Sequence, residues 1–222
     1  MGALLIDKLT LGYRKTPIFH QFSHEFARGC HIVQGANGIG KSTLLAAVSG
    51  SLPYKGRILI NGHELSDDAV AARRALGYVP DITEFYPFVT GSQFAEFVFR
   101  AHECGLASHR SRYAELIDRF NIQRYMNCTF SQMSLGTRKK MFIFTALLLE
   151  PALLVMDEPF NGLDRAASHE LTALLNELSA SCTILLTCHQ PAIVEKIDGM
   201  RWTLRQAPHK ALMRDEATYA LS

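Results

Sequence analysis

A glycine-rich run at residues 35–43, GANGIGKST, contains the most chemically informative residues of this chain. Gly35, four further residues, Gly40, Lys41 and Ser42 have the spacing of a Walker A phosphate-binding loop. Glycines there let backbone N–H groups close around phosphate oxygens, and the start of a following helix adds partial positive charge. We expect Lys41 to reach the β- and γ-phosphates of a nucleotide and the Ser42 hydroxyl to ligate Mg²⁺. The residues expected to bind the nucleotide in this loop are Gly35, Ala36, Asn37, Gly38, Ile39, Gly40, Lys41, Ser42 and Thr43.

Two adjacent carboxylates, Asp157 and Glu158, follow the apolar run LLVM at residues 153–156. Four apolar residues in a row are typical of a buried parallel strand, and ligands of open α/β sheets bind at the C-terminal ends of such strands. Asp157 then suits a Walker B role in holding Mg²⁺, and Glu158 suits a general base that polarises the attacking water. The alternative is a strand that merely ends in acidic turn residues, which the phosphate-binding loop elsewhere in the chain argues against.

The elements that would hold these groups predict an α/β fold with a P-loop NTPase core and a mainly parallel sheet. Strand-like residues 31–33 precede the glycine-rich loop, and the apolar run at residues 44–48 follows it as a helix. Asn61-Gly62 is a hairpin signal, so residues 1–80 should include an antiparallel β edge subdomain. Apolar spacings of three and four predict an inserted α-helical subdomain at about residues 83–136. Helix and strand then alternate through about residue 204.

A third segment resembles a known family. Residues 133–151, MSLGTRKKMFIFTALLLEP, resemble the signature segment of ATP-binding cassette (ABC) proteins, whose usual core is LSGGQ. Ser134 and Gly136 keep two of its positions, whereas Met133, Leu135 and Thr137 replace Leu, Gly and Gln. Residues 161–164 resemble the D-loop of the family, and His189 resembles its switch histidine. The resemblance extends from Leu4 to about Leu204.

This resemblance implies a single ABC ATPase domain over residues 1–222, with a RecA-like core and with ATP and Mg²⁺ as cofactors. It implies that Glu158, His189 and Lys41 are catalytic and that Tyr13, Ser134, Gly136 and Asp164 add to the nucleotide site. Tyr13 would stack on adenine, although it could also be a half-buried strand tyrosine. Two copies, or this chain and a related cassette, would sandwich two ATP molecules, each between the P-loop of one subunit and the signature segment of the other.

One position departs from the family pattern. Most cassettes carry a glutamine after the strand at residues 77–80, whereas this chain has Asp81. The family glutamine touches Mg²⁺ and the attacking water and links them to the membrane subunit. A carboxylate could serve instead, because Mg²⁺ favours hard oxygen ligands and often binds through water. We therefore expect Asp81 to assist the metal, and the alternative is an ordinary solvated loop acid.

Composition and charge narrow the function classes. The net charge of +2 gives no reason to expect a nucleic-acid partner, and the basic run at residues 138–140 is interpreted as a solvated helix face. No segment approaches the roughly 20 apolar residues of a membrane span. We expect a cytoplasmic chain, peripheral on the cytoplasmic face of the membrane, that docks on an integral membrane permease subunit through its helical subdomain. The aromatic segment at residues 85–88 belongs to that docking region.

The resemblance therefore implies an ATPase subunit that energises a transporter. The sequence GYVPD at residues 77–81 is most similar to the corresponding segment of exporter cassettes. A soluble ABC ATPase that acts on DNA or ribosomes is the alternative. Such proteins usually contain a long coiled-coil insertion or a second cassette, and neither is evident in this sequence.

Overall fold

The computed structural model describes residues 2–13, 16–83, 85–205 and 211–215, without the side chains of Tyr13, Thr16 and Pro17. The strands of the described ranges are β1 Leu4–Tyr13, β2 Thr16–Phe26, β3 Gly29–Gln34, β4 Lys55–Ile60, β5 His63–Glu64, β6 Leu76–Val79, β7 Leu153–Met156, β8 Thr183–Thr187, β9 Met200–Arg205 and β10 Ala211–Arg214. The α-helices are α1 Lys41–Val48, α2 Ala69–Arg74, α3 Gly91–Ala101, α4 Leu106–Phe120, α5 Leu135–Leu147, α6 Arg165–Leu178 and α7 Pro191–Val194. Two short 3₁₀ helices are η1 Gln123–Tyr125 and η2 Phe130–Gln132.

The central sheet has six strands in the order β10-β9-β3-β8-β7-β6. All neighbouring pairs are parallel except β10 with β9, which is antiparallel. β7 and β8 are buried along their whole length, as expected for apolar strands with helices on both faces. The predicted mainly parallel sheet is therefore confirmed, whereas β10 lies beyond the part of the chain where the sequence indicated a strand.

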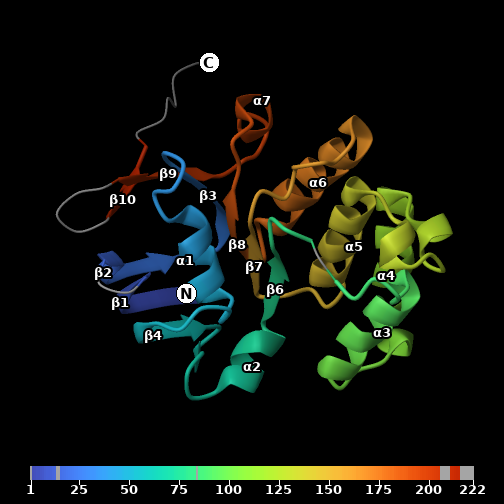
Figure 1. The fold of residues 1–222 in the computed structure, drawn as a ribbon, viewed down its shortest axis with the longest axis horizontal. Helices are drawn as coiled ribbons and strands as arrows, with labels where there is room; N and C mark the ends of the chain where they lie inside the picture. Colours follow the sequence, from blue (N-terminus) through green and yellow to red (C-terminus); the bar gives the residue numbers. More distant parts are fainter. Residues whose placement is uncertain (1, 14–15, 84, 206–210, 216–222) are drawn as a thin grey trace.

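Helices cover both faces of this sheet, and alternate residues of β7 show which helix covers which face. Leu153 and Val155 pack in one apolar core with α1, and Leu154 and Met156 pack in another with α5 and α6. Figure 1 shows α1 on one side of β7 and β8, and α5 and α6 on the other. The P-loop helix and the helix that follows the signature segment are thus separated by the sheet.

A second sheet, antiparallel and ordered β2-β1-β4-β5, packs beside α1. Asn61 and Gly62 connect β4 and β5 with positive φ values, as a tight hairpin requires. This confirms the predicted antiparallel β edge subdomain.

The inserted region contains α3 and α4, which lie beyond α5 in Figure 1. α3 begins at a capping box in which Thr90 and Gln93 satisfy each other's backbone N–H groups, and α4 ends at Asn121 in the left-handed conformation. Phe94 of α3 packs against Phe130 and against Phe142 of α5, so that aromatic contacts join the inserted region to α5. Among the described helices, none combines the length and apolar character needed to cross a bilayer.

Candidate functional site

The glycine-rich loop connects β3, in the middle of the sheet, to α1. Gly35 has a φ of 142°, and a Cβ there would lie 2.8 Å from the Leu204 carbonyl oxygen, so a side chain is excluded. Gly40 is the N-cap of α1 with a φ of 110°, and none of the described side chains caps the first turn. The first backbone N–H groups of α1 therefore have no side-chain cap and are available to an anion such as a phosphate.

Lys41 begins α1 and folds back over the loop. Its residue is 7% exposed, and its Nζ donates hydrogen bonds to the carbonyl oxygens of Gly35 at 2.9 Å and Ala36 at 3.1 Å. Burial lowers the pKa of Lys41, while the negative charges of Glu158 and Asp157 act in the opposite direction. The ammonium group thus lies within electrostatic range of both carboxylates. Ser42 is exposed on the first turn of the same helix.

Thr187, at the end of β8, contacts both acidic residues that follow β7. Its hydroxyl donates to Asp157 Oδ1 at 2.7 Å and accepts from the Glu158 backbone N–H at 2.9 Å. The Asp157 N–H donates to the Val79 carbonyl at 2.8 Å, which extends the pairing of β6 with β7 by one step. Thr187 was not among the predicted site residues. Its signal is a hydroxyl at the C-terminal end of a strand, directly after the apolar residues 184–186.

Glu158 has the geometry of a residue under functional constraint. Its φ is 45°, a left-handed conformation that non-glycine residues adopt at a cost of about 1–3 kcal/mol. Glu158 Oε2 accepts the His189 backbone N–H at 3.3 Å, and His189 Nε2 lies 3.1 Å from Oε1. Burial raises the pKa of Glu158, with His189 opposing the shift and Asp157 and Asp81 adding to it. A carboxyl group with a raised pKa beside an imidazole is suited to accept a proton.

Asp81 follows β6 and lies close enough to Glu158 to influence that pKa. Its Oδ1 accepts a long hydrogen bond of 3.4 Å from Asn161 Nδ2, and its side chain is 47% exposed. Lys139 Nζ, from α5, donates to the carbonyl oxygens of Pro80 at 2.9 Å and Asp81 at 2.7 Å.

The interpretation of residues 138–140 as a solvated helix face is therefore wrong. Lys139 is 1% exposed, because α5 packs against the segment after β6 and Lys139 lies on the packed side. Arg138 Nε donates to the Phe130 carbonyl, and Lys140 Nζ pairs with Asp164 Oδ2 at 2.7 Å. Charge alone indicated solvent exposure, but backbone carbonyl groups satisfy the buried ammonium.

The signature-like residues lie at the start of α5, across the sheet from α1 (Figure 1). Ser134 is the N-cap of α5, and its Oγ accepts from the Thr137 N–H at 3.2 Å and shares a 2.9 Å hydrogen bond with Thr137 Oγ1. Asp164 caps α6 by accepting the Ala167 N–H, which, with Lys140, holds the pKa of Asp164 below its usual value. Within this chain, these residues are not brought to the P-loop. The Tyr13 side chain lies outside the described part of the structure.

The donor set around Asp157 fits Mg²⁺. Within the described residues, no group of three or more His, Cys, Asp or Glu side chains is gathered as metal ligands would be. Mg²⁺, however, is usually bound by one or two carboxylates together with waters and substrate phosphates. The Asp157 carboxylate, held in one orientation by Thr187, and the exposed Ser42 hydroxyl supply hard oxygen donors of that kind.

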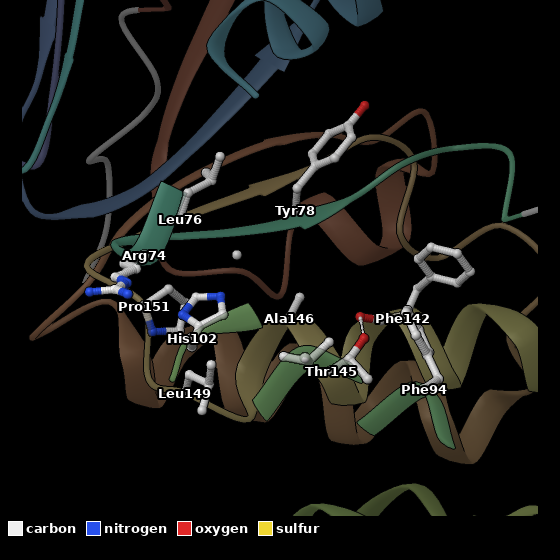
Figure 2. A pocket seen from close by; sticks show the side chains of 12 residues that line it. Arg74, Leu76, Tyr78, Phe94, His102, Phe142, Thr145, Ala146, Leu149 and Pro151 are labelled. Atoms are coloured by element: carbon white, nitrogen blue, oxygen red, sulfur yellow. Dashed lines mark hydrogen bonds between the residues drawn. The ribbon is translucent and has the colours of Figure 1, made fainter. Parts of the chain in front are cut away.

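A separate groove of about 170 Å³ lies between the edge strand β6 and helices α3 and α5. Figure 2 shows Arg74, His102 and Pro151 at one end of it and Phe94 and Phe142 at the other. The Tyr78 ring points away from α5, toward the P-loop side of the strand. Arg74 Nη2 also pairs with Glu103 at 2.5 Å and joins α2 to the turn after α3.

A parallel sheet whose central strand leads through a glycine-rich loop into a helix is the fold of P-loop NTPases. Within this class, the family described as ABC transporter matches residues 19–161. The chain therefore belongs to the ABC transporter family. It is an ATP-binding subunit of that family, whose members hydrolyse ATP for transport, and the resemblance seen in the sequence is confirmed.

The chain is also similar to individual ATP-binding proteins of this family. The ABC-type transporter ATP-binding protein EcsA of Bacillus subtilis is 29% identical over 199 residues, which cover 88% of this chain and 81% of EcsA. The daunorubicin resistance ATP-binding protein DrrA3 of Streptomyces coeruleorubidus is 35% identical, over 83% of this chain and 60% of DrrA3. The Nod factor export ATP-binding protein I of Ralstonia nicotianae is 29% identical, over 96% of this chain and 69% of that protein. A solved ATP-binding subunit of an ABC transporter superposes with a TM-score of 0.86 at 29% identity, over 95% of this chain and 90% of that structure.

Proposed function

We propose that this chain hydrolyses Mg²⁺-bound ATP to drive export of a substrate through a separate integral membrane subunit. The observation that carries the proposal is the group formed by Asp157, Glu158, Thr187 and His189 at the C-terminal ends of two adjacent parallel strands. The charge of Lys41 and the uncapped first turn of α1 lie in the same part of the molecule.

The residues divide the chemistry as follows. Backbone N–H groups of the loop and the Lys41 ammonium bind the phosphates, and Ser42 and Asp157 hold Mg²⁺. Glu158 accepts the proton of the attacking water, and His189 holds the Glu158 carboxylate in place. When bound at Ser42 and Asp157, Mg²⁺ would neutralise negative charge that develops on the transferred phosphoryl group.

The signature-like residues support a site shared between two subunits. Ser134 and Gly136 begin α5 on the opposite side of the sheet from α1, so they cannot complete the P-loop of their own chain without rearrangement. In a pair of cassettes, formed by two copies or by this chain and a relative, the uncapped turn of one subunit would face the start of α5 of the other. Asp164 and Lys140 join the D-loop to this helix and would hold the shared face together.

An exposed apolar surface supports docking on a membrane subunit. Tyr86 and Phe88 are 63% and 72% exposed, and Phe85 beside them packs on Phe94 at one end of the groove. Exposed aromatic residues rimmed by polar groups are typical of protein interfaces. Docking there would hold the chain at the cytoplasmic face of the membrane. Two relatives are named for daunorubicin resistance and for Nod factor export, which favours export as the direction.

Glu158→Gln tests the proposal, because it keeps the size of the side chain and removes the basic carboxylate. ATP should still bind, while the turnover number falls by about 10²-fold or more. The variant should accumulate as an ATP-bound dimer, which size-exclusion chromatography with light scattering would detect. ATPase activity near that of the wild type would refute the base assignment, and an ATP-saturated variant that stays monomeric would refute the shared site.

A further inference from the structure

Lys139 is a buried cation that the hydrolytic chemistry described above does not use. It is the only lysine besides Lys41 that is buried among the described residues, and its residue is 1% exposed. Lysine side chains usually extend their charged ends into water, because removing an ammonium group from water is costly. A methionine could fill similar space without that cost. The position of this charge therefore calls for an explanation beyond packing.

The contacts of Lys139 all lead to one short segment. Its Nζ donates to the carbonyl oxygens of both Pro80 and Asp81, and it lies 3.9 Å from Asp81 Oδ1. These two residues directly follow β6, whose last residue, Val79, accepts the Asp157 N–H. The Lys139 side chain, from α5, thus fixes the backbone directly after β6. This point of the chain lies next to Asp157, the expected Mg²⁺ ligand.

Asp81 is held from two sides. Lys139 holds its backbone, and Asn161, between β7 and α6, holds its carboxylate through the 3.4 Å hydrogen bond to Oδ1. The backbone contact leaves the carboxylate 47% exposed and near Glu158. Since Lys139 stands five residues after Ser134 on one continuous helix, a displacement of the start of α5 would be passed to the Asp81 segment.

We propose that Lys139 is a positioning residue for ATP hydrolysis: it ties the segment of Pro80 and Asp81 to α5 and so aims the Asp81 carboxylate at the site of Asp157 and Glu158. The inference deepens the proposed function and rests on it, because the role given to Asp81 requires the Mg²⁺ site of Ser42 and Asp157. The positive charge of Lys139 also offsets the negative charge that Asp81 adds beside the phosphates. Lys139 acts through Asp81 and is therefore a positioning residue and not a catalytic one.

The first test uses the protein without nucleotide or metal and measures amide hydrogen exchange of residues 79–83. Lys139→Met keeps an unbranched side chain and removes the charge and the donors, so exchange in this segment should rise several-fold. Lys196→Met makes the same substitution at an exposed position and should leave the exchange unchanged. If Lys139→Met does not fold, Lys139→Leu, which also lacks the charge and the donors, takes its place. Unchanged exchange in the folded variant would overturn the proposal.

The second test measures the Mg²⁺ concentration that gives half-maximal ATPase activity. Loss of a group that orients a metal-site residue typically costs 10- to 100-fold in metal affinity, so Lys139→Met should raise this concentration about tenfold. The same substitution in an Asp81→Ala background should have no further effect, because Lys139 acts through Asp81. An unchanged requirement in Lys139→Met, or an equal rise in both backgrounds, would overturn the proposal.

Asp81→Ala alone distinguishes the metal role of Asp81 from the role of Lys139 in holding the segment. If it leaves the Mg²⁺ requirement unchanged, the metal role of Asp81 is refuted, and the catalytic part of the Lys139 proposal is refuted with it. Hydrogen exchange would then still decide whether Lys139 holds the segment, while the Glu158→Gln result would stand independently for the ATPase itself.

Discussion

At the residue scale, the site depends on one hydroxyl that contacts both acidic residues, the side chain of Asp157 and the backbone of Glu158. Thr187 fixes the rotation of the Asp157 side chain and satisfies the backbone N–H of Glu158, which has a positive φ. The hydroxyl therefore supports both the expected metal ligand and the strained conformation of the expected base. Its neighbours in β8 are apolar and buried, so no water can readily replace it.

Thr187→Val should accordingly impair both stability and catalysis. The isosteric change leaves the Glu158 N–H unsatisfied and should lower the free energy of unfolding by about 1–3 kcal/mol. It should also raise the Mg²⁺ concentration for half-maximal ATPase activity. Thr183→Val is the matched control: Thr183 is fully buried in the same strand, with hydrogen bonds to Ala3 and Ala27. It should lose comparable stability in urea unfolding but keep its Mg²⁺ dependence, and equal Mg²⁺ responses of the two variants would contradict the role of Thr187.

Residues adjacent to strand ends could be anticipated from the sequence, whereas residues placed by tertiary packing could not. Asp157 and Glu158 directly follow the apolar strand β7, and His189 lies two residues after the end of β8, so their position at one edge of the sheet follows from the parallel fold. The prediction that Lys139 is exposed to solvent is wrong because its partners, Pro80 and Asp81, lie 59 and 58 residues away along the chain. A basic triplet on a helix specifies charge, but only the packing of α5 on β6 decides which of the three is buried.

At the scale of elements, the start of α5 and the D-loop approach each other closely. A Cβ at Gly136 would lie 2.3 Å from the Gly162 carbonyl oxygen, and the exposed Leu135 side chain lies beside Gly162. The Lys140 to Asp164 ion pair joins the same two elements. The sequence placed both segments in one family pattern, but the spacing along the chain did not indicate this backbone contact.

Gly136→Ser should therefore be costly even though serine is the better helix former. The added Cβ must separate the two elements, and overpacking of this kind costs about 1–3 kcal/mol of unfolding free energy. We expect that loss in chemical denaturation, together with reduced ATPase activity. Gly105→Ser is the control, because a Cβ at Gly105 meets no atom of the described residues within 4 Å and serine is a favoured N-cap for α4. A Gly136→Ser variant as stable as Gly105→Ser would show that the contact is easily relaxed.

At the scale of the whole molecule, an aromatic and histidine cluster joins the two sheets. His31 in β3 donates from Nε2 to the Ala27 carbonyl at 2.8 Å and accepts the Trp202 indole N–H from β9 at 3.1 Å. His24 in β2 packs edge-on against Phe26 and Trp202, with ring centroids 4.4 and 4.7 Å away. His24 Nε2 is shielded from solvent and has no hydrogen-bond partner among the residues that the structure describes.

Both histidines favour the neutral form in the folded protein. Burial lowers the pKa of His24, and the charge of His31 adds to the shift. Burial also lowers the pKa of His31; the hydrogen bond to Ala27 opposes this shift, and Arg214 adds to it. The unfolded chain therefore binds more protons than the folded chain just below the ordinary histidine pKa of 6.5. The stabilisation is complete above that value and is lost as the pH falls through it toward the lowered pKa values.

The melting temperature of the nucleotide-free protein should consequently be lower at pH 5.5 than at pH 7.5. The raised pKa of Glu158 acts in the opposite direction, because the folded protein binds that proton more readily, so the decisive measurement is a difference between variants. His24→Phe places an apolar ring among Phe22, Phe26 and Trp202 and removes a titrating group from the cluster. It should reduce the drop in melting temperature between the two pH values, whereas His169→Phe, at a side chain that is 80% exposed on α6, should not. A drop of the same size in the wild type and in His24→Phe would show that the contact between the two sheets does not govern the acid sensitivity of the protein.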